Sequence, residues 1–185
     1  MRVSQHLSLI SIAALVSMPP LHAQRPPAIH GVTGTIASEA TIKDEHKAAH
    51  KIVVVTEDGV EHVYDAAKDL VVHGGTKVLA DLKPGTTVVI HYTAGASGDV
   101  AQEIDRVGAG GLSVTEGIVT KIDRGKKEIT IRYDNGTVEK LELTTRSAVD
   151  AAGDFSNVAI GDTRVVVYYS DDAGRKVAHY FKRKS

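Results

Sequence analysis

The chain has 185 residues and almost balanced charge, with 22 basic and 23 acidic side chains. This balance argues against a protein whose main task is to neutralise a nucleic-acid backbone, so nucleic acid is not an expected partner. The chain has no cysteine, which excludes disulfides, thiol nucleophiles and thiolate metal sites. It also has no tryptophan, and aromatic residues make up 4% of it, which weakens any function that depends on stacking sugars or bases.

Residues 1–23 have the features of a secretory signal peptide. Arg2 supplies the positive charge at the start, an apolar run follows from Leu7 to Val16, and a cleavage motif ends at Ala23. The run is well short of the roughly 20 residues that a membrane-spanning helix needs. We therefore expect a periplasmic or secreted protein, with no transmembrane segment in the mature chain.

The mature chain contains an internal repeat. When the sequence is shifted by 77 positions, residues 52–106 align with residues 129–183 without a gap, apolar on apolar and turn on turn. The opening strands align at a shift of 83, so the first copy carries six additional residues between its first two strands. We predict an N-terminal segment at 24–30, a first module at 31–107, a flexible Gly-rich linker at 108–112 and a second module at 113–185.

Both modules have the pattern of antiparallel β structure. Asp58-Gly59 and Asn135-Gly136 each separate two runs rich in Val, Ile, Thr and Tyr, which is the strongest short signal for a β-hairpin. The expected strands are 51–56 with 60–66, 128–133 with 137–143, 87–93 and 164–170. Each copy has a loop after its hairpin and about five strands in all. Because short strands lose their open edges by closing, the predicted fold class is all-β, with two tandem OB-like five-stranded barrels. One larger β-sandwich or barrel shared by both copies is the alternative.

Several motifs carry a family resemblance. The second copy has the opening strand Gly117–Asp123 and the strand Ile129–Ile131, and the first has the turn Asp81–Gly85 and the strand Val88–Ile90. In these motifs each copy resembles the exported bacterial OB-like modules that are grouped as a domain-of-unknown-function family. The resemblance covers most of the mature chain and implies an OB-like fold and an exported location. It implies no catalytic residue, because its motifs are turns and core strands.

One candidate metal site lies in the additional segment of the first copy. If Asp44 caps a helical turn there, His46 and His50 share one face at i,i+4 spacing, which can chelate a divalent metal. Glu45 or Asp44 would add an oxygen ligand. The alternative is an ordinary solvated loop, which is favoured by the absence of both histidines from the second copy. No other cofactor is expected.

No residue pattern predicts a catalytic site. Ser97 lies in a Gly-containing hairpin turn without the strand-to-helix context of a nucleophile. The two copies share no histidine, and His179 aligns with Gln102. Because alternate residues of a strand face opposite ways and Ile90 faces the core, we expect His91 to be a surface histidine. The sequence therefore favours a protein that is not an enzyme.

We expect a non-enzymatic binding or structural module of the cell envelope, whose partner is an envelope protein, a polymer or a small ligand. The alternative is a periplasmic metal-binding protein that uses the segment with His46 and His50. The basic end of the chain, Tyr180–Lys184, is expected to be a solvated tail. Contact of this end with anionic lipid, an envelope polymer or the acidic first copy is the alternative.

Overall fold

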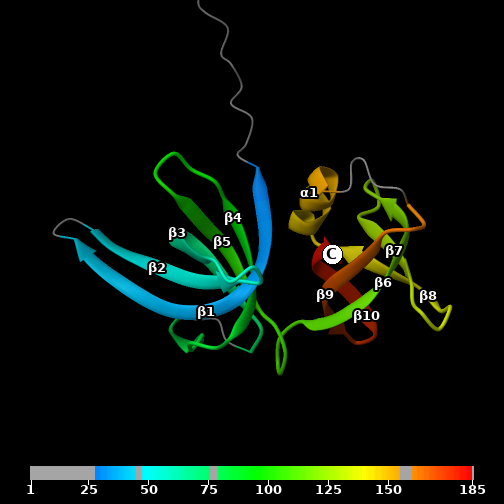
Figure 1. Cartoon of the computed structure of the whole chain (residues 1–185), viewed down its shortest axis with the longest axis horizontal. Helices are drawn as coiled ribbons and strands as arrows, with labels where there is room; N and C mark the ends of the chain where they lie inside the picture. The colour runs from blue at the N-terminus through cyan, green and yellow to red at the C-terminus, as the bar shows by residue number, and fades with distance from the viewer. Residues whose placement is uncertain (1–27, 45–46, 76–78, 155–159, 185) are drawn as a thin grey trace, which may run out of the picture.

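A computed structural model describes residues 28–44, 47–75, 79–154 and 160–184. This part of the chain is mostly β and forms two closed five-stranded barrels, one after the other along the sequence (Figure 1). The predicted all-β fold with two OB-like barrels is therefore confirmed, and no single barrel or sandwich is shared by the two halves. The expected signal peptide lies outside the described residues.

Barrel 1 has its strands in the order β1-β2-β3-β5-β4. Its elements are β1 (Ile29–Asp44), β2 (Lys47–Thr56), β3 (Glu61–His73), the 3-10 helix η1 (Leu79–Asp81), β4 (Thr87–Thr93) and β5 (Asp99–Arg106). The barrel closes because β1 pairs with both β2 and β4, and β3 pairs in parallel with β5.

Barrel 2 has its strands in the order β10-β8-β7-β6-β9, which is equivalent to that of barrel 1. Its elements are β6 (Ser113–Asp123), β7 (Glu128–Arg132), β8 (Val138–Leu143), the helix α1 (Thr145–Asp154), β9 (Arg164–Asp172) and β10 (Arg175–Arg183). In the described ranges, no helix is long and apolar enough to cross a membrane.

Alternating apolar side chains fill the interior of each barrel, as period-two strands require. The core of barrel 1 includes Ile52, Val54, Tyr64, Ile90 and Ile104. The core of barrel 2 includes Ile129, Ile131, Leu141, Val167 and Phe181. These side chains are almost entirely β-branched or aromatic, which is the class that favours strands.

A glycine allows the first strand of each barrel to approach the second closely. A Cβ on Gly34 would lie 2.4 Å from Val54 Cγ1, and one on Gly117 would lie 2.3 Å from Ile131 Cγ2. Only glycine fits at such a separation. A β-bulge follows each glycine on the same strand, and both features occur at equivalent places in β1 and β6.

The barrels also share an irregularity near their last strands. β5 pairs with β4 through a bulge at Gln102, and β10 pairs with β9 through a bulge at His179. Gln102 Nε2 donates a hydrogen bond to Thr93 Oγ1 at 3.2 Å, and His179 Nε2 lies 3.1 Å from Ser170 Oγ in the same arrangement. Both pairs of positions differ by 77, which is the shift that aligns the two halves of the sequence.

The structure corrects two expected elements. Helix α1 stands where the sequence analysis expects a loop, because Thr144 Oγ1 accepts the Ser147 N–H at 3.0 Å and caps the first turn. The additional segment of the first copy is not a helical turn where it is described, since Asp44 of β1 pairs with Lys47 of β2 in one long hairpin.

The segment between the barrels, residues 108–112, forms a hydrogen-bonded turn. The Gly108 N–H donates to the Leu112 carbonyl at 2.9 Å, and the Leu112 N–H donates to the Arg106 carbonyl at 2.7 Å. Leu112 itself is buried. The connection therefore holds the end of β5 close to the start of β6.

Gly117→Ala is expected to destabilise the protein by about 1–3 kcal/mol, because the added methyl group overlaps Ile131 and the Arg132 carbonyl oxygen. Gly125→Ala is the matched control, since a Cβ at that position meets no atom closer than 3.7 Å. Urea unfolding followed by circular dichroism measures both free energies. Equal values for the two variants would contradict the close approach of β6 to β7.

Candidate functional site

The two barrels pack against each other through residues of β4, β9 and β10. Val89, Leu112, Tyr168 and Tyr180 form a buried apolar cluster at this junction. The ring of Tyr180 also meets the ring of His91 edge-on, with the centroids 6.2 Å apart. Side chains that face away from the core of one barrel are thus covered by the other.

The outer face of barrel 1 brings two carboxylates and two histidines to the junction. Glu103 and Asp105 are two residues apart on β5, so their side chains leave the same face of the strand. In the sheet, Glu103 lies opposite His91 of β4, and Asp105 lies opposite His73 of β3. The side chains of His91 and Asp105 have no exposed surface, and that of Glu103 is 12% exposed.

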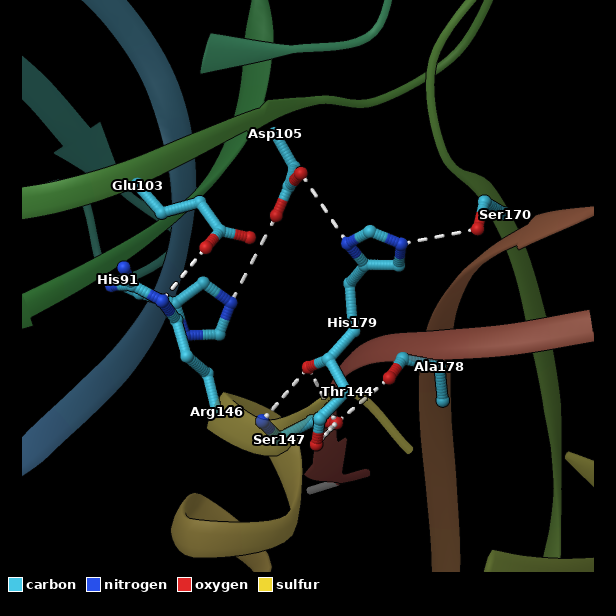
Figure 2. Close-up of polar contacts among 9 residues, drawn as sticks. All are labelled: His91, Glu103, Asp105, Thr144, Arg146, Ser147, Ser170, Ala178 and His179. Atoms are coloured by element: carbon cyan, nitrogen blue, oxygen red, sulfur yellow. Dashed lines mark hydrogen bonds and ion pairs between the residues drawn. The ribbon is translucent and has the colours of Figure 1, made fainter. Parts of the chain in front are cut away.

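Barrel 2 contributes His179 and Arg146 to the same place. His179 is the additional residue of the β10 bulge, and its ring points toward barrel 1 (Figure 2). Arg146 lies in the first turn of α1, which is fixed to β10: Ser147 Oγ donates to the Ala178 carbonyl at 2.7 Å, and the Thr144 N–H donates to the same oxygen at 3.1 Å. Two adjacent residues of β10 therefore position both cationic groups.

Figure 2 shows how these side chains meet. The Asp105 carboxylate lies between two imidazoles, with His179 Nδ1 3.4 Å from Oδ1 and His91 Nε2 3.9 Å from Oδ2. Neither contact has hydrogen-bond geometry, and both Asp105 oxygens are buried without a hydrogen-bond donor from the described residues. Arg146 Nε forms an ion pair with Glu103 Oε2 at 2.8 Å.

Burial and neighbouring charges shift the pKa values of two groups in the cluster. Burial raises the pKa of Glu103, and the negative charge of Asp105 raises it further, against the opposing effect of the nearby histidines and Arg146. Burial lowers the pKa of His179, but the adjacent Asp105 carboxylate outweighs this effect and the net shift is upward. Among the described residues, Arg146 is the one permanent cation beside this pair of carboxylates, and the cluster therefore favours an additional positive charge.

Three of these groups lie close enough to share one ion. One nitrogen of His73 and one oxygen each of Glu103 and Asp105 all lie within 4.8 Å of one another. Donor atoms of a tetrahedral site are about 3.4 Å apart when the ligand distances are about 2.1 Å, so small side-chain rotations bring the three into place. His73 is exposed, which opens the cluster to solvent on one side.

His91 is buried, so its expected place at the surface is wrong. The predicted direction is right, because Ile90 faces the core of barrel 1 and His91 faces away from it. Barrel 2 packs on this outer face and buries His91. The alternation of apolar and polar residues along one strand gives no information about such packing between barrels. Sequence reasoning misses Glu103 and Asp105 for the same reason. Their i,i+2 spacing on one strand was the available sequence signal, because it places both carboxylates on the same face of that strand.

The structure describes only one of the two predicted ligands, His46 and His50, and places it away from this cluster. His46 is outside the described residues, and His50 is an exposed residue of β2 that pairs with Thr41 of β1. Because His50 lies in the strand β2 and not in a helical turn, i,i+4 spacing does not place it on one helical face with His46. Metal binding by this pair stays a prediction.

The basic end of the chain is part of the junction and not a solvated tail. Tyr180 and Phe181 are buried in β10. Lys182 forms an ion pair with Glu57 of barrel 1 and donates a hydrogen bond to Thr33 at 3.2 Å. Contact with the acidic first copy, the alternative from the sequence, is therefore observed.

Comparison with known proteins adds little to this description. No protein-family model and no curated protein matches the chain. Among solved structures, it is similar to a deletion mutant of the single-stranded DNA-binding protein from Thermus aquaticus, at 11% sequence identity and a TM-score of 0.24, over 85% of this chain and 94% of that one. A TM-score this low carries no argument, so the resemblance to a family of exported modules stays a prediction.

The stability of the metal-free protein is expected to fall as the pH rises above the ordinary histidine pKa of 6.5. The pKa of His179 is raised above its ordinary value of 6.5 in the folded state. Its ion pair with Asp105 is therefore complete below that value and is lost as the pH rises through the higher folded pKa. Urea unfolding at a series of pH values, in EDTA, measures the slope.

Asp105→Asn removes the charge that raises the pKa of His179 and is expected to flatten this slope. His62→Gln changes an exposed histidine outside the cluster and is the control, with the wild-type slope. An undiminished slope in Asp105→Asn would contradict the role of the His179–Asp105 pair.

Proposed function

We propose that this chain is an exported, non-enzymatic metal-binding protein of the cell envelope that holds a divalent transition-metal ion between its two barrels. The observation that carries the proposal is the group of donor atoms from His73, Glu103 and Asp105, which lie within 4.8 Å of one another. The proposal keeps the metal-binding alternative from the sequence but uses different ligands.

The buried Asp105 carboxylate is the strongest argument for a bound cation. Removing a carboxylate from water is costly unless its charge is paired and its oxygens are satisfied. Arg146 pairs with Glu103, whereas Asp105 has imidazoles at 3.4 and 3.9 Å and no hydrogen-bond donor from the described residues. A divalent ion would neutralise both carboxylates and bond to an oxygen of each.

The donor types indicate the class of ion. Imidazole nitrogens combined with carboxylate oxygens suit Zn²⁺, Ni²⁺, Co²⁺ or Cu²⁺, whereas Mg²⁺ and Ca²⁺ prefer oxygen donors throughout. His179 Nδ1 is buried, has no hydrogen-bond partner among the described residues and faces Asp105 from barrel 2. It lies outside the group of three donor atoms, and a shift of its side chain would bring it to the ion as a fourth donor. Ser170, at the other ring nitrogen, would hold the ring in orientation.

The other parts of the proposal rest on the sequence. Export is supported by the signal-peptide features of residues 1–23. A non-enzymatic role is supported by the lack of any nucleophile–base pattern in the sequence. Tandem duplication of one module is supported by the equivalent bulges at Gln102 and His179. Since only one of these positions is a histidine, the proposed ion belongs to the junction and not to each module separately.

Calorimetric titration of the mature chain with Zn²⁺, Ni²⁺ and Mg²⁺ tests the function. Zn²⁺ and Ni²⁺ are expected to bind with a Kd below about 10 μM and Mg²⁺ is not. His73→Ala and Asp105→Asn should each weaken Zn²⁺ binding by about 10–100-fold, because each removes a ligand. Circular dichroism verifies that both variants are folded.

His46→Ala/His50→Ala is the matched control, since it removes two histidines outside the cluster and should keep the wild-type affinity. Loss of binding in this control, with full binding by Asp105→Asn, would place the ion on the β1–β2 hairpin instead. A wild-type protein that binds none of these ions more tightly than about 100 μM would refute the metal function.

A further inference from the structure

Arg146 pairs with the Glu103 carboxylate, which is also one of the proposed metal ligands. Its Nε lies 2.8 Å from Glu103 Oε2, and the two side chains come from different barrels. One oxygen of the same Glu103 carboxylate lies within 4.8 Å of a donor atom of His73 and of a donor atom of Asp105. One carboxylate is thus shared between a guanidinium and the proposed metal ligands.

Part of the Arg146 guanidinium has no hydrogen-bond partner among the described residues. A guanidinium binds a carboxylate best through two parallel N–H bonds. Arg146 approaches through Nε, while its Nη1 is buried without a hydrogen-bond partner among the described residues. The guanidinium therefore keeps unsatisfied hydrogen-bonding capacity at Nη1 while it is paired with Glu103.

The backbone at Arg146 is fixed independently of Glu103. Thr144 caps α1, and Ser147 bonds to the Ala178 carbonyl of β10, so the first turn belongs to barrel 2 whether or not the guanidinium is paired. The side chain of Arg146 is 28% exposed and therefore borders solvent. A rotation of this side chain toward solvent breaks no contact of the helix backbone.

We propose that Arg146 is an internal competitor of the metal ion: it neutralises Glu103 when no ion is bound and is displaced from Glu103 when the ion binds. This inference rests on the proposed metal site and adds the residue that regulates its affinity. A guanidinium and a divalent cation on one carboxylate repel each other, and more strongly in a buried place than in water. Arg146 therefore lowers the affinity that the ligands alone would give.

Titration of the mature chain and its variants with Zn²⁺ tests this competition. Arg146→Met removes the charge, keeps most of the side-chain length and is expected to bind Zn²⁺ at least about tenfold more tightly than the wild type. Arg146→Lys keeps a positive charge and is expected to bind less tightly than Arg146→Met. Lys182→Met is the matched control, because it removes another cation of barrel 2 that pairs with a carboxylate of barrel 1, Glu57, and should leave the affinity unchanged.

Displacement itself has a direct readout in the NMR signal of the Arg146 Nε–H. Exchange of this proton with water should be slow in the metal-free protein, where it is paired with Glu103, and faster after addition of Zn²⁺. Unchanged exchange in the zinc-bound wild type would contradict displacement.

The outcomes separate the inference from the proposed function. If folded Arg146→Met binds Zn²⁺ no more tightly than the wild type, the competition is refuted and the metal site remains. Equal tightening by Lys182→Met would also refute it, because the effect would then come from overall charge. If neither the wild type nor Arg146→Met binds Zn²⁺, the metal site itself is refuted.

Discussion

The carboxylates of Glu103 and Asp105 lie where the two barrels meet, Asp105 fully buried and Glu103 largely so, and removing their charge from water opposes formation of this junction. Because this desolvation is unfavourable, barrel 2 has to place compensating positive charge at the contact. Arg146 has to stand beside Glu103, and an imidazole has to stand beside Asp105. Helix α1 places Arg146 beside Glu103, and the bulge of β10 places His179 beside Asp105. Both features therefore bring a cationic group to a carboxylate of barrel 1.

The apolar part of the junction supplies the favourable free energy. Val89, Leu112, Tyr168 and Tyr180 are buried together, and each large apolar side chain removed from water contributes about 1.5–3 kcal/mol. An apolar patch of this kind tolerates several orientations of its partner. Charged contacts at two places, Arg146 with Glu103 and Lys182 with Glu57, are far more selective in geometry.

The sequence predicts the barrels well and the junction poorly, because the barrels follow from local sequence patterns and the junction depends on contacts between residues far apart in the sequence. Asp58-Gly59 and Asn135-Gly136 mark the hairpins because turn chemistry is local, and alternation then places residues such as Ile90 in a core. The junction joins side chains that lie far apart along the chain, so no local pattern contains it. The bulge at His179 adds a second obstacle, since it interrupts the alternation from which its direction would be inferred.

The two bulge positions have a consequence for how such a site can arise. A bulge residue stands outside the alternation of its strand, so its side chain can change without disturbing the core. Gln102 and His179 illustrate this, because they occupy equivalent places and contact equivalent hydroxyls, those of Thr93 and Ser170. Codons for glutamine and histidine differ by one base. A single nucleotide change is therefore enough to exchange an amide and an imidazole at such a position while the core of the barrel stays the same.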